Sequence, residues 1–465
     1  MAEPQGRLLN ILGVAFGLAG AVGGTLGGGI LRTPGLVAAQ LGSPGWILAA
    51  WIAGGLYALL GAVCVAELGA SLPRAGGWYV YARRAYGDAV GFCVGWIDWL
   101  GHCAGLAWVA VTTAGYGHDL WPGLPLGERP LALLLLALFA LVQLAGVRAA
   151  GAGQQLLSLV KAVAFLALVG AFLLLGHGAA APLAGAPLAQ APAGAGVAAA
   201  GPASALAVVL ALQAVITTYD GWHSPIYFAE EFSEPGRDLP RSLLGGVLAV
   251  VLIYVLVNVA LLQVLPPERI AASSLPVADA AALLFGGLSD TLITGLCLVS
   301  LLGLINAAVM GAPRILYGLS RDGLFAPALA GVNPGGTPVP ALLATTLCTG
   351  LLVLGGSFER LLGIAAFLYV ALYATGISAL LVLRRREPDL ARPFRSWGQP
   401  WNALLVIGVS LAFLVAAGLG DRLDSGLALL LAGVGLPLRL GVARLGAAGE
   451  NGAVAEAGND AGRSG

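Results

Sequence analysis

The first long apolar segment of the chain contains Gly23-Gly24-Thr25-Leu26-Gly27-Gly28-Gly29-Ile30, a stretch that decides how this segment folds. From Leu8 to Leu41 the segment is apolar enough for one membrane helix, but three consecutive glycines lie near its centre. Each glycine destabilises a helix by about 1 kcal/mol relative to alanine. In hydrocarbon, a broken helix is tolerated only where its freed backbone groups line a cavity or are buried in protein. We therefore predict a broken helix that lines a binding site.

The composition indicates a membrane protein. The chain has 465 residues, of which 58% are hydrophobic and 10% are charged, and its formal net charge is zero. Its apolar runs recur along the whole sequence and are long enough to cross about 30 Å of hydrocarbon. No cleavable signal peptide is evident at the amino terminus, so the first apolar segment is expected to be a membrane span that is not cleaved off. The five cysteines occur singly in apolar runs, which favours buried thiols over metal ligands or disulfides.

The apolar runs predict an all-α membrane protein with twelve spans. The first five are residues 11–40, 45–70, 86–117, 130–148 and 154–176, and the next five are residues 203–231, 243–265, 283–318, 339–356 and 361–384. Two more, residues 401–419 and 425–443, close the membrane region, residues 385–445. The Ala/Pro/Gly segment 177–202 is predicted to be an extracellular loop. Residues 1–10 and a disordered tail, residues 446–465, are expected in the cytoplasm.

The arginines predict the orientation in the membrane. With the amino terminus inside, most arginines fall on the inner side, and the outer side keeps only Arg129, Arg269, Arg360 and Arg422. Cytoplasmic loops carry such an excess of basic residues. Both termini are therefore expected in the cytoplasm, in agreement with the even number of spans. The bias towards alanine, glycine and arginine is typical of bacteria with GC-rich codons. The expected location is therefore the bacterial plasma membrane, which is the inner membrane.

The sixth predicted span, residues 203–231, supplies a second break. Its apolar run ends at Thr217-Thr218-Tyr219-Asp220-Gly221-Trp222-His223-Ser224-Pro225. Glycine, proline and β-branched residues together disfavour a continuous helix there. Because the two breaks lie five spans apart, the broken helices 1 and 6 have opposite orientations. This predicts a 5+5 inverted repeat, residues 11–176 and 203–384, with the site where the breaks meet. The alternative is that the glycines serve only close helix packing.

Several ordered motifs resemble the amino acid–polyamine–organocation (APC) superfamily. Gly27-Gly28-Gly29-Ile30 with Thr33-Pro34-Gly35 is similar to its first-helix motif, which is usually Gly-Ser-Gly-Ile. Further matches are Gly42-Ser43-Pro44-Gly45, Ala66-Glu67-Leu68-Gly69, Pro73-Arg74-Ala75-Gly76-Gly77-Trp78-Tyr79, Tyr219-Asp220-Gly221-Trp222, Ala229-Glu230-Glu231 and Ser320-Arg321-Asp322-Gly323-Leu324-Phe325. The chain is most similar to the L-type amino acid transporter branch and its bacterial relatives. The resemblance implies the LeuT-type inverted repeat.

The two breaks predict a site for an α-amino acid. Backbone N–H groups at the start of a half-helix favour anions, so Gly28, Gly29 and Ile30 are assigned to the carboxylate. The resemblance implies the same assignment. The ammonium is expected at carbonyl oxygens near Val22, Gly23 or Thr217. The predicted substrate site therefore comprises Val22, Gly23, Gly27, Gly28, Gly29, Ile30, Thr217, Tyr219, Asp220, Gly221 and Trp222.

The resemblance also bears on the gate over the substrate. In relatives, one aromatic residue in the sixth-helix break closes over the substrate, and Thr217 aligns with it here. Tyr219, Trp222 or a residue from another helix then remain as candidate gates. Asp220 is expected to receive the ammonium, to cap a half-helix or to pair with a cation. Asp98 and His102 share one helical face and are interpreted as a local polar pair, with a role in the vestibule as the alternative.

Lys161, near the middle of the fifth predicted span, is the only lysine among 23 Lys and Arg residues. A buried lysine can release its proton, whereas arginine cannot. Ionisable groups inside membranes are functional by default, although a lysine snorkelling to the interface is the alternative. The resemblance places this lysine where sodium-coupled members bind the ion. We expect Lys161 to be the coupling residue, either as a fixed cation in place of sodium or as a proton-coupling group.

These features predict a secondary active transporter of amino acids that works by alternating access, as an exchanger or as a proton-coupled symporter without sodium. Transport of polyamines or other organic amines is the alternative. The chain lacks the polar rings of a channel, a convergent catalytic cluster and the P-loop of an ATP-driven pump. No cofactor, metal ion, nucleic acid or obligatory heavy-chain partner is expected. An inner gate of ion pairs is expected among Glu67, Arg74, Glu230, Glu231, Arg237, Arg241, Arg321 and Asp322.

Overall fold

The computed structural model describes residues 7–176, 204–355, 358–420, 422–423, 425–435 and 437–439. Within these residues the regular structure is helical, and the only β contact is an isolated bridge between Leu12 and Phe232. The predicted all-α class is confirmed. The predicted loop 177–202 and tail 446–465 lie outside the described residues, as do parts of the predicted amino terminus 1–10 and of the span 425–443.

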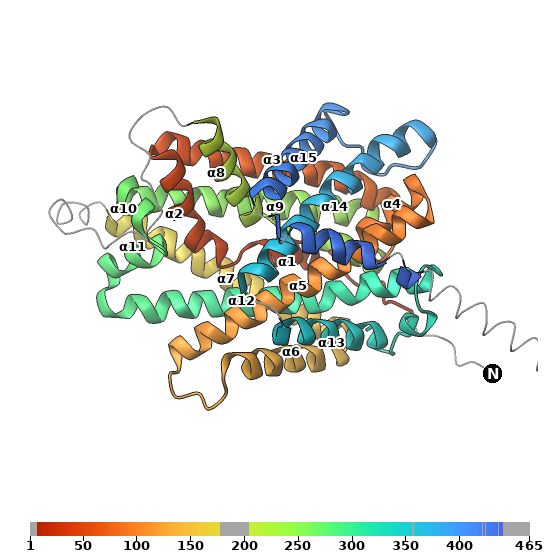
Figure 1. Cartoon of the computed structure of the whole chain (residues 1–465), viewed down its shortest axis with the longest axis horizontal. Coiled ribbons are helices and arrows are strands. Elements are labelled where there is room, and N and C mark those ends of the chain that lie inside the picture. The colour runs from red at the N-terminus through yellow and green to blue at the C-terminus, as the bar shows by residue number, and fades with distance from the viewer. Residues whose placement is uncertain are drawn as a thin grey trace, which may run out of the picture.

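The helices follow the predicted apolar runs in order (Figure 1). Those of the first half are α1 (Val14–Thr25), α2 (Gly29–Leu41), α3 (Pro44–Ser71), α4 (Trp78–Tyr86), α5 (Asp88–Leu120), α6 (Glu128–Leu144) and α7 (Val147–Leu175). Those of the second half are α8 (Ala205–Thr218), η3 (Ser224–Glu231), α9 (Pro235–Val264), α10 (Pro267–Ala272), α11 (Pro276–Phe285), η4 (Gly286–Leu288), α12 (Ser289–Arg321), η5 (Pro327–Ala330), α13 (Val339–Gly355), α14 (Phe358–Arg386) and α15 (Trp401–Gly420). A further apolar helix runs from Ser425 to Arg439.

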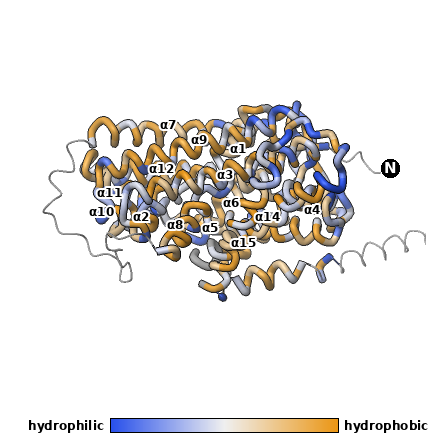
Figure 2. Tube along the Cα trace, turned by 90° about the horizontal axis from the view of Figure 1, so that it is seen from above, coloured by the Kyte–Doolittle hydropathy of each residue, from blue (hydrophilic) through white to orange (hydrophobic). Residues whose placement is uncertain are grey.

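Seven of the described helices are long and apolar enough to cross a membrane, and the bent pair α1–α2 makes an eighth. The helices α8, α13 and Ser425–Arg439 are apolar but shorter. The chain is therefore a multi-pass helical protein, and the count of twelve spans and the 5+5 repeat stay predictions. Figure 2 shows hydrophobic residues along the long helices, with hydrophilic residues gathered mainly at the end of the molecule where α4 lies.

Both predicted breaks are present. The first span divides into α1 and α2, whose axes differ by 48°, with Leu26, Gly27 and Gly28 between them. Leu26 has an extended backbone (φ −71°, ψ 93°), which ends α1. The sixth span divides into α8 and the 3-10 helix η3, with residues 219–223 between them. Gly27 and Gly28 lie in the first break and Gly221 lies in the second, where the sequence predicts the interruptions.

Three short helices have no counterpart among the predicted spans. These are α4 in the first half and α10 and α11 between the seventh and eighth spans. The helix α10 packs closely on α2, since a Cβ atom placed on Gly35 would lie 2.6 Å from the carbonyl oxygen of Ser273, directly after α10. The glycine therefore allows these segments to touch.

The helix α7 shows how the sequence separates a lipid face from a protein face. Gln154, Ser158 and Lys161 are buried and recur every three or four residues, so they share one face. On the other face, Leu156 and Leu159 are more than half exposed, which suits contact with hydrocarbon tails. The polar face of α7 packs against α1 and α12. This arrangement presents the only lysine of the chain to the broken helix.

Candidate functional site

The two breaks touch at Gly24 and Gly221. A Cβ atom placed on Gly221 would lie 2.2 Å from the carbonyl oxygen of Gly24, so only glycine fits there. Gly221 also has φ of +101°, a conformation that L side chains rarely adopt. The Ser224 hydroxyl donates to the Gly221 carbonyl at 2.6 Å and begins η3 next to this contact. The segments that the sequence predicted to meet are therefore in contact.

The glycines of the first span divide into two kinds. A Cβ atom on Gly17 would lie 2.0 Å from Ser242 Oγ, and one on Gly23 would lie 2.1 Å from Gln154 Nε2. These glycines serve close packing against α9 and α7. By contrast, a Cβ atom on Gly28 would have no heavy atom within 4 Å, although the residue is partly buried. Close packing therefore explains Gly23 and does not explain Gly28.

The start of α2 is open to an acceptor. Gly28 is the residue before α2, and no side chain caps this end of the helix. The first N–H groups of a helix have no acceptor within the helix, so they are available to a ligand. Gly27 and Gly29 lie closer to protein, because Cβ atoms there would come within 2.9 Å of Leu304 Cδ1 and 3.2 Å of Thr218 Cγ2. Ile30 is fully buried, so only its backbone can face a ligand.

Lys161 contacts the end of α1 directly. Its Nζ atom donates to the carbonyl oxygens of Gly23 and Leu26, at 2.6 and 2.9 Å. The side chain is fully buried, which argues against snorkelling to the membrane surface. These two carbonyls belong to the last turn of α1, where partial negative charge accumulates and a cation is stabilised. Lys161 therefore supplies a donor to two carbonyl oxygens at the break, and a positive charge when it is protonated.

Tyr254 on α9 is a second ligand of the breaks, and our sequence analysis did not identify it. Its hydroxyl lies 2.8 Å from the carbonyl oxygen of Thr25 and 3.2 Å from that of Thr218, so one side chain joins the ends of α1 and α8. The Thr33 and Thr218 hydroxyls, 2.7 Å apart, join α2 to α8. A tyrosine within an apolar helix gave no signal, because tyrosine is common in cores.

The predicted ammonium ligands already have donors. The Val22 carbonyl accepts from Leu26 N at 2.8 Å, the Gly23 carbonyl accepts from Lys161, and the Thr217 carbonyl accepts from Asp220 N at 3.3 Å. Each carbonyl oxygen has a second lone pair. The structure thus places these three oxygens at the ends of α1 and α8. The Thr217 oxygen also receives the N–H of Tyr219, so only the Val22 and Gly23 oxygens keep a further acceptor position.

A small cavity of about 20 Å³ lies beside the second break. It is lined by Ile216, Thr217, Asp220, Ala366, Tyr369, Val370 and Tyr373, from the end of α8 and from α14. The hydroxyl of Tyr373 donates to Asp220 and lies 3.2 Å from Nδ1 of His223. Such a volume holds about one water molecule, so a substrate would require the helices to separate.

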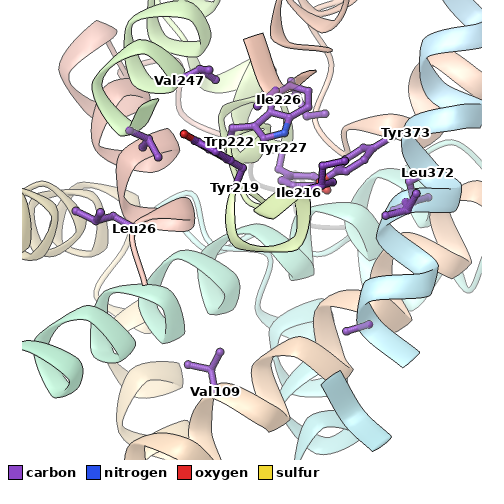
Figure 3. Packing of buried hydrophobic residues seen from close by; sticks show 14 of the residues in the cluster. Leu26, Val109, Ile216, Tyr219, Trp222, Ile226, Tyr227, Val247, Leu372 and Tyr373 are labelled. Carbon is purple, nitrogen blue, oxygen red and sulfur yellow. The ribbon is translucent and has the colours of Figure 1, made fainter. Parts of the chain in front are cut away.

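Tyr219 and Trp222 pack in the core beside the break (Figure 3). The Tyr219 hydroxyl donates to the carbonyl oxygen of Trp51 at 3.1 Å. The Trp222 ring lies 5.7 Å from the ring of Tyr373. The aromatic side chains that line the cavity come instead from α14, Tyr369 and Tyr373, which is consistent with a gate from another helix.

A buried polar network on α6, α7 and α12 packs against α1. Ser158 Oγ donates to the Ala19 carbonyl at 2.8 Å. Asn306 Nδ2 donates to Gln154 Oε1 at 2.9 Å, and Gln143 Nε2 donates to Asn306 Oδ1 at 3.1 Å. These contacts join α6, α7, α12 and α1, so Asn306 has a structural role apart from the cavity.

Charged residues predicted at the inner ends of the spans form ion pairs at the end of the molecule where α4 lies. Asp322 contacts Arg74 and Arg83, each at 2.8 Å, and Arg321 pairs with Glu230. These contacts connect α4, η3 and α12. Ion pairs this close to the surface are individually weak, so their effect depends on their forming a network.

Two of the predicted acids are fully buried and paired. Glu231 in η3 pairs with Arg314 on α12, which our sequence analysis did not select as its partner. Glu67 accepts from Arg384 Nε at 2.9 Å and lies 3.1 Å from Arg392. Arg237 instead pairs with Glu234 within its own turn at 3.3 Å. The buried pairs fix η3 and α3 to their neighbours, because removing one partner would leave an unpaired buried charge.

Comparison with known proteins identifies the family. The chain matches the amino acid permease family over residues 8–436. It is 26% identical to the serine/threonine exchanger SteT of Bacillus subtilis, over 95% of this chain and 99% of that protein. It is 29% identical to the human large neutral amino acids transporter small subunit 2, over 80% of this chain and 70% of that protein. It is 28% identical to the mouse Asc-type amino acid transporter 1, over 90% and 78%. This chain belongs to the amino acid permease family, within the APC superfamily.

Proposed function

We propose that this protein is a secondary active transporter that carries amino acids across the plasma membrane by alternating access. It works as an exchanger or a proton-coupled symporter, without sodium. Its relatives are amino acid transporters and exchangers, which supports this activity over the transport of polyamines or other amines. They are not enzymes, and their names favour neutral amino acids as the first substrates to test.

The observation that carries this proposal is the open space at Gly28. Both neighbouring glycines have protein close to the position of a Cβ atom, and Gly28 has none within 4 Å. The residue directly precedes α2, where N–H groups favour a carboxylate. With no side chain at this point, or only a small one such as the serine of the usual family motif, a ligand can reach the backbone. Gly28, Gly29 and Ile30 are therefore our proposed carboxylate site.

Lys161 supports transport without sodium. Its ammonium lies against two carbonyl oxygens at the end of α1, the kind of ligand that a sodium ion would take. A protein that holds its own cation there has no need of a dissolved one. We propose that Lys161 couples the conformation of α1 to the occupancy of the site, either as a fixed cation or by exchanging a proton.

The ion pairs around Asp322 and Glu230 are our proposed inner gate. They join η3, which follows the second break, to the ends of α4 and α12. Opening towards this side would have to separate them. The proposed topology keeps twelve spans with both termini in the cytoplasm, and it needs no heavy-chain partner.

Counterflow into proteoliposomes tests the proposal. Vesicles preloaded with serine, threonine or leucine should take up the same labelled amino acid in a saturable manner, and vesicles without internal amino acid separate exchange from symport. Uptake that does not saturate, or that is seen only with polyamines, would contradict the proposed activity.

The variant Gly28→Val tests the site within that assay. Its backbone (φ −65°, ψ −15°) accepts an L residue, and a Cβ atom there meets no described heavy atom within 4 Å, so the variant should fold normally. The usual family motif has serine at this position, so a Cβ atom alone is compatible with the site. We expect affinity for the amino acid to fall at least about tenfold, or 1.4 kcal/mol, because the branched side chain of valine occupies the path of the carboxylate. Gly170→Val on α7, where a Cβ atom also meets no described heavy atom within 4 Å, is the matched control. Equal affinity in both variants would show that the carboxylate binds elsewhere.

A further inference from the structure

Asp98 and His102 form a buried pair on α5, next to Tyr369, which lines the small cavity beside the second break. Asp98 is fully buried and His102 is 9% exposed. Nδ1 of His102 lies 3.1 Å from Asp98 Oδ1 and 2.9 Å from the Asp98 carbonyl oxygen. A carbonyl accepts only, so Nδ1 carries the hydrogen in this arrangement. The predicted local contact between these two residues is present.

The two oxygens of the Asp98 carboxyl have different surroundings. Oδ1 accepts the hydroxyl of Tyr227 at 2.9 Å as well as facing His102. Oδ2 is buried and has no hydrogen-bond partner among the described residues. Nearly all buried polar atoms are partnered, so an orphaned carboxyl oxygen calls for a ligand or a proton. An ionised carboxylate beside a neutral imidazole would give the pair a net negative charge, and one added proton makes it neutral.

The arginines of two neighbouring helices, α12 and α4, are paired with carboxylates other than Asp98 or lie away from it. Arg314 on α12 pairs with Glu231, and the α4 arginines Arg83 and Arg84 pair with Asp322, Asp88 and Glu387. The α13 segment carries one titratable side chain, Cys348, and the charged residues of α6 are exposed at its start. The groups that face the pair are Tyr227, His223, Asp220 and Tyr369.

Polar rings connect this pair to the second break. The His102 ring packs edge-on against Tyr227, with centroids 4.9 Å apart, and against Tyr369, at 5.3 Å. Tyr369 lines the cavity together with Asp220. Tyr227 belongs to η3, directly after the break, and its ring lies 5.7 Å from that of His223. A movement of η3 would therefore weaken or break the hydrogen bond that the Tyr227 hydroxyl donates to Asp98 Oδ1.

We propose that Asp98 and His102 form a proton-binding site, distinct from Lys161, whose occupancy is linked to the opening of the substrate site through Tyr227. The proposal rests on the proposed transport function for its coupling, while proton binding itself does not depend on it. A hydronium ion of the aqueous phase gives one proton to the pair and becomes water, and no other covalent bond changes. Because the Tyr227 hydrogen bond stabilises the carboxylate, its loss when η3 moves strengthens proton binding. By reciprocity, protonation favours the state in which η3 has moved.

Histidine NMR tests proton binding without substrate. The chain has four histidines, so ¹⁵N-histidine spectra of the purified protein in nanodiscs are simple, and His102→Gln identifies the signal of His102. We expect this signal to shift with pH as the imidazole gains and loses its proton. Asp98→Asn and Tyr227→Phe should each shift the midpoint by at least one pH unit, a tenfold change in proton affinity.

Counterflow measured over the same pH range tests the coupling. The wild-type rate should change with pH, and Asp98→Asn should flatten the profile. Asp119→Asn, the same substitution at an exposed position on the same helix, should retain the wild-type midpoint and profile. Should Asp98→Asn fail to fold, Tyr227→Phe, which removes one hydroxyl, supplies both measurements. A His102 signal that does not titrate, or a midpoint unchanged in Tyr227→Phe, would overturn the proton site. Titration with an unchanged transport profile would overturn the coupling, and absence of all counterflow would refute the transport function alone.

Discussion

Replacing Lys161 with methionine removes the only lysine and keeps most of its volume. Methionine has a flexible, unbranched side chain that fills the space of the lysine side chain between α7 and α1. It cannot donate to the carbonyl oxygens of Gly23 and Leu26, which Nζ reaches at 2.6 and 2.9 Å. The substitution therefore isolates the charge and its two hydrogen bonds from the packing of the side chain.

The expected change in folding free energy is small because two large terms oppose each other. A hydrogen bond from a charged donor contributes about 1.5–3 kcal/mol, so two of them contribute about 3–6 kcal/mol. Burying the ammonium costs several kcal/mol, which the methionine variant avoids. We expect the two terms to cancel to within about 2 kcal/mol, and the variant to remain folded. Counterflow should fall at least tenfold, since the end of α1 loses the cation that sets its position.

Ser158→Ala is the matched control. Ser158 lies one turn from Lys161 on the same face of α7 and donates to the Ala19 carbonyl of α1 at 2.8 Å. Its loss should cost about 1 kcal/mol of stability. Ala19 is farther from the break, so counterflow should stay close to that of the wild type. Wild-type counterflow and pH dependence in Lys161→Met would refute the coupling role.

Sodium separates the two roles left open for Lys161. In Lys161→Ala the shortened side chain leaves space beside the Gly23 and Leu26 carbonyls, which are suitable ligands for a small cation. If Lys161 acts as a fixed cation, sodium should raise the melting temperature of this variant and restore part of its counterflow. If the lysine exchanges a proton, sodium should change neither the melting temperature nor the counterflow of this variant.

Two further substitutions test the contact between the breaks. Tyr254→Phe removes the hydroxyl donor that the Thr25 and Thr218 carbonyls share. The free energy of unfolding should therefore fall by about 1–3 kcal/mol, measured by thermal unfolding. An unchanged melting temperature would contradict the role given to this hydroxyl. Gly221→Ala places a Cβ atom 2.2 Å from the carbonyl oxygen of Gly24, at a residue whose φ is positive. Little folded protein should therefore elute in size-exclusion chromatography. A normal monodisperse peak would show that the contact can relax.

The positions of the breaks could be predicted because their causes are local. Consecutive glycines at Gly27-Gly28-Gly29 weaken a helix whatever surrounds it, and Gly221 with Pro225 does the same in the sixth span. The location of Lys161 within a span could be predicted, because it lies near the middle of a long apolar run. It was singled out because it is the only lysine of the chain. Its two carbonyl ligands were beyond prediction, because they depend on how far α7 is rotated against α1.

The partners between distant segments could not be predicted for the same reason. Tyr254 joins two carbonyls that are 193 residues apart, from a third helix, and nothing in the local sequence marks it. Glu231 was selected as one of several inner charges, but its partner Arg314 lies within α12. Such contacts arise when separate helix faces are brought together, and a single sequence contains no record of that pairing.

The structure also decides between two explanations of the glycines, and both hold at different positions. Close packing accounts for Gly17, Gly23 and Gly24, where a Cβ atom would overlap a neighbour. It does not account for Gly28, which faces open space. A sequence shows only that glycine is present. The surroundings of each glycine separate a packing requirement from a site for ligand approach.

The ligands of the two breaks suggest how the site divides the charges of an amino acid. Lys161 and Tyr254 occupy the carbonyl side of the first break, at Gly23, Leu26 and Thr25. The N–H side, at the start of α2, has no side-chain cap. The carbonyl side of the first break therefore already has two donors, one of them a lysine, which suits a carboxylate nearby and disfavours an ammonium. We infer that the ammonium binds on the side of the second break, where Asp220 is the acid that lines the cavity.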